Sequence, residues 1–146
     1  SICDDLKSNI SPFLCTRAYL LFCKSLKFMP SLENIPVDIF VLFHQFATQY
    51  INQRELSPQW IGSVLGMQKM LSKLPSSMLP SNMRELLQNL ATMATSGNLQ
   101  SESLLLCLDT MITFIRKIET SSLDTNTVNG LIQCSLKLWQ TYSKDS

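Results

Sequence analysis

His44 is the one side chain whose type could support acid–base chemistry near neutral pH without a large pKa shift. It stands between the apolar residues Phe43 and Phe46, in a stretch whose spacing predicts a helix. Acid–base catalysis needs several titratable groups that converge in a cleft, and this segment supplies one. A hydrogen-bonded imidazole at a helix boundary is therefore favoured over a general base. With only four glycines the chain also lacks a phosphate-binding loop, so we predict no catalytic residue and no enzymatic activity.

The five cysteines, Cys3, Cys15, Cys23, Cys107 and Cys134, are the other reactive groups. Zinc sites use close pairs of cysteine or histidine, whereas Cys15 and Cys23 are eight residues apart, roughly 12 Å along a helix. We therefore predict no metal and no cofactor. Four of the five lie in apolar stretches, where a thiol behaves as a small hydrophobe. This usage and the odd number favour a reducing compartment, the nucleus or the cytoplasm; a secreted helical-bundle ligand with paired cysteines is an alternative.

The elements that carry these residues are predicted by proline and serine pairs that stand directly before apolar stretches. Proline suits the first position of a helix, and a preceding serine can cap the free amides there. No strand-length alternation of apolar and polar residues competes with this pattern. The sequence therefore predicts an all-α fold with helices at about 11–29, 36–52, 57–73, 81–95, 101–119 and 124–142.

The length of 146 residues and the hydrophobic fraction of 45% suit a single domain, which we interpret as part of a larger protein. The proline-containing linker 74–80 is the candidate for an internal boundary. Short loops predict antiparallel neighbours. The helices form either stacked hairpins, similar in pattern to armadillo and HEAT repeats, or a compact helical bundle.

Gly62 and Gly66 stand four residues apart inside the third predicted helix. Glycine costs roughly 1 kcal/mol relative to alanine in a helix interior, so a packing reason is expected. We predict that a neighbouring helix crosses closely at this point.

Charge does not single out a partner class. Twelve basic and eleven acidic residues give a net charge of +1, and charged residues make up only 16% of the chain. Most basic residues lie in the last turns of the predicted helices, where they complement the helix dipole. In a stacked array these helix ends would form a basic edge able to bind nucleic acid or an acidic peptide, which is an alternative function. The basic edge would consist of Lys24, Lys27, Lys69, Lys73, Arg116 and Lys117.

Apolar surface is in surplus at the N-terminal end. The helices predicted at 11–29 and 36–52 are apolar around nearly their whole circumference, and two helices at one end of a domain cannot both be central. Either the rest of a parent chain covers them or they form an interaction surface. In the second case the aromatic anchors would be Tyr19, Phe22, Phe28, Phe40, Phe43 and Tyr50.

The function predicted from these features is that of a scaffold or adaptor domain. It would dock an apolar or amphipathic segment, supplied by a protein partner or by another region of the parent chain. A homodimer is a further alternative. A membrane partner is not expected, because the longest apolar run is far shorter than the roughly 20 residues of a membrane span.

Overall fold

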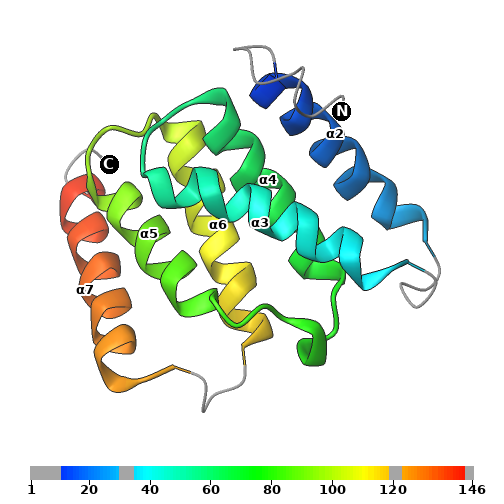
Figure 1. Cartoon of the computed structure of the whole chain (residues 1–146). Coiled ribbons are helices and arrows are strands. Elements are labelled where there is room, and N and C mark those ends of the chain that lie inside the picture. The colour runs from blue at the N-terminus through cyan, green and yellow to red at the C-terminus, as the bar shows by residue number, and fades with distance from the viewer. Residues whose placement is uncertain (1–10, 30–34, 119–122, 144–146) are drawn as a thin grey trace.

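The computed structural model describes residues 11–29, 35–118 and 123–143, which form six α-helices and two short 3-10 helices without a strand among them. This confirms the all-α prediction, and each predicted helix is present (Figure 1). The elements are α2 (Ser11–Ser25), η1 (Leu26–Phe28), α3 (Val37–Gln53), α4 (Pro58–Lys73), η2 (Ser76–Met78), α5 (Met83–Thr95), α6 (Ser101–Lys117) and α7 (Thr125–Tyr142).

The helix ends follow from local chemistry. Ser57 caps α4: its hydroxyl oxygen accepts a hydrogen bond from the Trp60 amide at 3.0 Å, with Pro58 at the first helical position. Arg54 ends α3 in the left-handed conformation, with φ of 51°. The α5 helix starts at Met83, two residues later than predicted, after a turn at positions 81 and 82.

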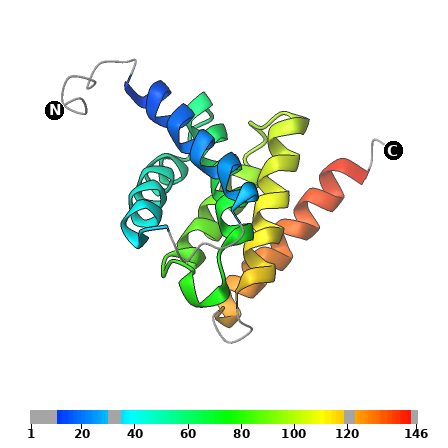
Figure 2. The ribbon, with the colours of Figure 1, turned by 90° about the vertical axis from the view of Figure 1, so that its right-hand side faces the viewer.

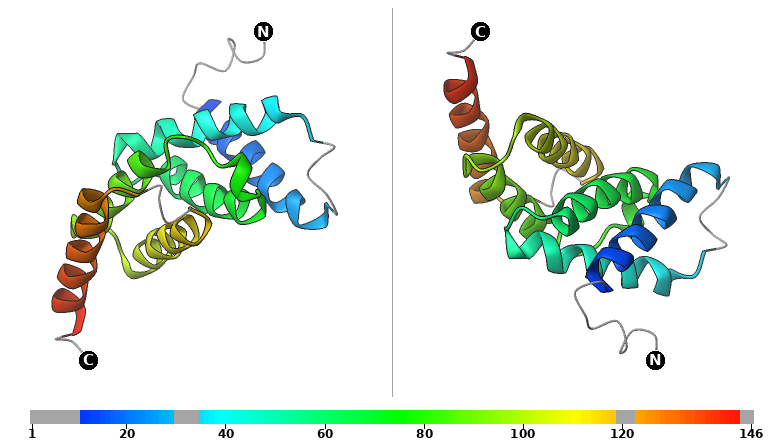
Figure 3. Two further views of the ribbon diagram at one scale, coloured as in Figure 1. Left: turned by 90° about the horizontal axis from the view of Figure 1, so that it is seen from below. Right: turned by 90° about the horizontal axis from the view of Figure 1, so that it is seen from above.

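The helices are arranged in two layers. One layer contains α2, α4 and α6, and the other contains α3, α5 and α7; neighbours within each layer pack on one another. The layers are joined by α3 against α4 and by α5 against α6 (Figures 1 and 3). Helices of the first layer run in one direction and helices of the second layer in the opposite direction. The fold is therefore a two-layered bundle of antiparallel helices with α4 at its centre. We call this two-layered array the stack.

The two glycines of α4 lie where α2 crosses it. A Cβ atom built on Gly62 would collide with the Thr16 methyl group, and one built on Gly66 would overlap the Tyr19 ring, with Cδ1 only 2.6 Å away. Thr16 and Tyr19 are both buried. The predicted close crossing at these glycines is confirmed.

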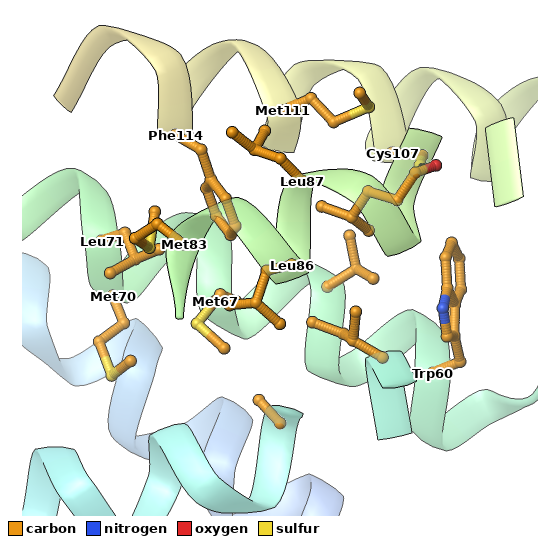
Figure 4. Close-up of a cluster of buried hydrophobic side chains, with 14 of the residues drawn as sticks. Trp60, Met67, Met70, Leu71, Met83, Leu86, Leu87, Cys107, Met111 and Phe114 are labelled. Atoms are coloured by element: carbon orange, nitrogen blue, oxygen red, sulfur yellow. Dashed lines mark hydrogen bonds between the residues drawn. The ribbon is translucent and has the colours of Figure 1, made fainter. Parts of the chain in front are cut away.

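The core continues through both halves of the chain. Side chains from α4, α5 and α6 meet around Met67, Leu86 and Phe114, all fully buried (Figure 4). The linker 74–80 lies along this core: the buried Leu74 has its carbonyl oxygen bound by the Lys117 amine of α6 at 3.1 Å. The helices on either side of the linker thus share one hydrophobic core.

Candidate docking groove

The C-terminal end of the stack contains an apolar groove between α6 and α7. These helices diverge from the start of α7 towards its end (Figure 2), and α7 packs on α5 instead. The groove has a volume of about 1040 Å³. We call it the docking groove; its lining residues are Ser101, Leu104, Leu105, Leu108, Met111, Ile112, Ile115, Leu131, Cys134, Ser135, Leu138, Trp139, Tyr142 and Ser143.

The apolar face of α6 extends beyond the residues that pack on α4 and α5, and the extra residues form one wall of the groove. Leu104 and Met111 point into the core and are buried, whereas Leu105 and Ile112, one position further around the helix, are 61% and 47% exposed. Residues three and four apart share a helix face, so Leu105, Leu108, Ile112 and Ile115 form one continuous stripe. This stripe faces the groove.

The opposite wall is formed by α7, which is held mainly through α5. The Cys134 thiol lies against the Ala91 carbonyl group, and the Lys137 amine donates to the Thr95 carbonyl oxygen at 3.3 Å. Trp139, on the side facing α6, is 72% exposed. An indole is costly to leave in water, so this side of α7 is suited to contact another apolar surface.

The position of the groove follows the order of the stack. The α4 helix packs on α2 and α3, and α6 packs on α4 and α5. The next place in that series is one that contacts α6 and α7, which is where the groove lies. A helix placed there would run parallel to α6 and antiparallel to α7, as α6 runs relative to α4 and α5.

Charge is confined to the margin of the groove. None of the lining residues is charged. Glu102, Asp109 and Arg116 are exposed and recur every seven residues beside Leu105 and Ile112, so they border the α6 wall. The groove can therefore bury an apolar stripe without desolvating an ion, and its margin can contact polar groups of a bound segment.

The aromatic anchors predicted at the N-terminal end occupy different environments. Tyr19 is fully buried and Phe40 is 6% exposed, so the expectation that these two side chains are accessible is wrong. The reason is the crossing at Gly66, which draws the Tyr19 ring into the core. Phe22 and Phe43 are half-buried and stack on each other, with ring centroids 4.7 Å apart.

The other two predicted anchors remain at the surface. Tyr50 is half-buried and meets Phe46 edge to face. Phe28 is 77% exposed, with the Lys27 amine over its ring. The structure thus gathers Tyr19, Phe22, Phe40 and Phe43 into an aromatic contact between α2 and α3, and leaves Phe28 outside it. A docking role for the exposed part stays a prediction.

His44 joins α3 to α5. Its Nε2 atom lies 2.6 Å from the Asn82 amide oxygen and 3.3 Å from the Thr48 hydroxyl, and Asn82 in turn donates to Thr48. Burial lowers the pKa of His44, and the hydrogen bond to Asn82 opposes that change in part. Among the residues that the structure describes, no carboxylate or thiol takes part in this network. These contacts are those of an inter-helix hydrogen bond, the alternative favoured by the sequence.

The described cysteines Cys15, Cys23, Cys107 and Cys134 are free thiols. Burial raises the pKa of both Cys23 and Cys107 to about 12, which makes them unreactive at neutral pH. Cys3 lies outside the described residues. Within residues 11–29, 35–118 and 123–143, no group of three or more histidine, cysteine or acidic side chains is placed to hold a metal ion.

Four of the six predicted basic residues lie at one end of the first layer. Because α2, α4 and α6 run in the same direction, their C-terminal turns, which carry Lys24, Lys73, Arg116 and Lys117, lie on the same side of the molecule. The Lys117 amine is already engaged by the Leu74 carbonyl oxygen, as expected of a cation near helix ends.

A smaller cavity of about 340 Å³ lies beside Lys117, between the linker and the start of α5. Arg84 also lines it, and its guanidinium lies 4.0 Å from the exposed Asp124 carboxylate. Both cations of this cavity thus have partners among the described residues, so it is less suited to capture an anion than its composition alone would indicate.

No family model, curated protein or solved structure matches this chain. Among the described residues, none of the helices has the length and apolar character needed to cross a membrane.

Proposed function

We propose that this chain is a non-enzymatic, intracellular protein-interaction domain that docks an amphipathic helix in the docking groove. The observation that supports the proposal is the groove itself, about 1040 Å³ in volume, with two apolar walls and no charged residue in its lining. Burial of apolar surface contributes about 25 cal/mol per Å², so a helix with a matching stripe would be held mainly by the hydrophobic effect. The exposed Trp139 is the natural anchor of such a contact.

The groove suits a helix better than an extended peptide. Its walls are two helices whose apolar side chains recur every three or four residues, so a third helix can pack its ridges between theirs. No sheet edge exists among the described residues to bind a strand. A bound helix would complete the alternation of the two layers.

The proposal is tested with an environment-sensitive dye, 8-anilinonaphthalene-1-sulfonate, and two synthetic peptides about as long as α7, which has 18 residues. One peptide carries leucines at helical positions i, i+3, i+4 and i+7; the other has the same composition in scrambled order. The amphipathic peptide should displace the dye and the scrambled peptide should not. Ile112→Asp should abolish both dye binding and peptide binding.

The matched control is Leu21→Asp, a substitution at a 70% exposed leucine in α2. It adds the same charge far from the groove and should leave the dye and the peptide bound. The proposal is contradicted if Ile112→Asp binds the peptide like the unmodified protein, or if Leu21→Asp alone loses it.

Nucleic-acid binding is a second candidate, supported by the shared side of the α2, α4 and α6 ends. It requires an affinity that falls steeply as salt rises. A labelled duplex of about 20 base pairs, titrated at two salt concentrations, would detect it.

The intracellular assignment is supported by the four free thiols. A thiol titration of denatured protein should return all five cysteines, whereas paired cysteines would favour the secreted ligand.

A further inference from the structure

The α7 helix exposes a second apolar feature next to the docking groove. Val128, Ile132, Leu136 and Trp139 are spaced by four, four and three residues and are 39%, 56%, 47% and 72% exposed. We call these four residues the α7 stripe. At this spacing they lie on one face of the helix, directed away from α5, and Trp139 also lines the docking groove. The described part of the chain leaves this face uncovered.

The α7 stripe has the properties that the docking groove requires of an occupant. It belongs to a helix with one charged side chain, Lys137, which is bound to the Thr95 carbonyl oxygen on the far side of the helix. Its flanking residues are amides and hydroxyls, such as Gln133 and Gln140. An uncharged stripe against an uncharged groove avoids burying an ion on either side, and the net charge of +1 gives two copies little mutual repulsion.

The directions of the helices and the symmetry of a pair of copies also favour an α7 helix from a second copy as the occupant of the groove. A helix that continued the order of the stack beside α6 would run antiparallel to α7. A two-fold axis perpendicular to α7 brings the α7 of a second copy antiparallel to the first. Each copy then inserts its α7 stripe into the groove of the other, which is an isologous and therefore closed contact.

We propose that two copies of this chain associate through the α7 stripe of each and the docking groove of the other. This inference rests on the proposed function, because it names the occupant of the same groove. A pair formed in this way covers the exposed Trp139 of both copies at once. The four helices at its centre, α6 and α7 from each copy, form an antiparallel bundle.

A competing occupant from a second copy is α2 together with η1, whose outer faces expose Leu14 and Leu21 in α2 and Phe28 in η1. If the α2 of one copy bound in the docking groove of the next copy, it would extend the first layer, and the contact would use a different surface on each copy. Such a contact does not close, so it produces an open series of oligomers instead of a dimer. The two arrangements are therefore distinguished by stoichiometry.

The experiment is sedimentation analysis of the full chain over a wide protein concentration range, with Ile132→Asp, Ile132→Ser and Leu21→Asp as variants. The unmodified protein and Leu21→Asp should show a reversible monomer–dimer equilibrium. Ile132→Asp should be monomeric throughout, and Ile132→Ser should weaken the dimer at least tenfold. Far-ultraviolet circular dichroism verifies that each variant is folded; the exposed position of Ile132 makes this the expected result.

A protein that is monomeric at every concentration overturns this inference. An open series of oligomers overturns it too, as does a dimer that Ile132→Asp leaves intact. If the protein is monomeric and the amphipathic peptide still displaces the dye, the groove remains a docking site and only its occupant is wrong. If the peptide also fails to bind, the proposed function fails with it.

Discussion

The two ends of the stack differ in how closely their outer helices pack against their neighbours. At the N-terminal end, α2 fits closely over Gly62 and Gly66 of α4, and the Tyr19 ring fills the space that a side chain would take. At the C-terminal end, α6 and α7 diverge, and large side chains such as Leu105 and Trp139 stay exposed. The contrast teaches that apolar content alone does not locate a binding surface. Small residues decide where neighbouring helices can close on one another.

The largest effect is expected from filling the close crossing. Gly66→Ala places a methyl group against the Tyr19 ring, so α2 must move away from α4. We expect the free energy of unfolding to fall by about 3 kcal/mol, measured by urea denaturation.

The control is Gly130→Ala in α7, where an added Cβ meets nothing within 4 Å. This change should raise the free energy of unfolding, by up to about 1 kcal/mol, since alanine is the better helix former. Equal effects of the two substitutions would mean that α2 does not pack against Gly66 as described.

An aspartate introduced at each end of the stack should change stability by different amounts, because Phe43 packs against the core and Ile112 lies at the surface. Phe43 lies between the rings of Tyr19 and Phe22, with centroid distances of 5.4 and 4.7 Å, so Phe43→Asp should cost about 3 kcal/mol. Ile112→Asp, at an exposed wall of the docking groove, should cost less than about 0.5 kcal/mol in the monomer. Thermal denaturation at low protein concentration measures both. A stable Phe43→Asp protein would contradict the placement of Phe43 against the core and would support the prediction that the N-terminal aromatic residues are docking residues.

The helix caps extend the comparison to local stability. Ser57→Ala removes the acceptor for the Trp60 amide and should lower the free energy of unfolding by about 1 kcal/mol, because α4 is the central helix.

Asp124 caps α7 by accepting from the Thr127 amide at 3.2 Å. Asp124→Ala should chiefly speed hydrogen exchange within α7, which packs on fewer neighbours. Exchange that rises throughout the chain instead would show that α7 is an integral part of the core.

The smallest expected effect is a pH dependence at the contact between α3 and α5. Burial lowers the pKa of His44 in the folded protein, so the unfolded chain binds a proton more readily. Stability should therefore be full above the ordinary histidine pKa of about 6.5 and fall as the pH drops below it. The chain has a single histidine, so His44→Gln should flatten this dependence between roughly pH 5.5 and 7.5. A dependence unchanged in this variant would assign the titration to another group.

The sequence predicts the helices well because their ends depend on local chemistry. Ser57 caps α4 by accepting from the amide of Trp60, three residues later in the chain. Gly62 and Gly66 let α2 approach α4 because they have no side chain. The docking residues could not be found in this way, because burial depends on which helices meet. The Tyr19 ring is buried by Gly66, which lies 47 residues away.

The docking groove left a weaker signal in the sequence. The apolar residues of α7 extend beyond Leu131, Cys134 and Leu138, which pack on the core and line the groove, and include Ile132 and Trp139. That excess could have indicated a second contact surface. The divergence of α6 from α7, which opens the groove, depends on how α7 packs on α5 and has no signature in either helix alone.

Hydrogen–deuterium exchange with and without the amphipathic peptide tests the central claim most directly, since it reports on both ends in one experiment. At a protein concentration low enough to keep the chain monomeric, the account predicts that the peptide slows exchange in α6 and α7, residues 101–117 and 125–142, and leaves α2 and α3 unchanged. Protection confined to α2 and α3 would contradict it and would place the docking surface at the N-terminal end.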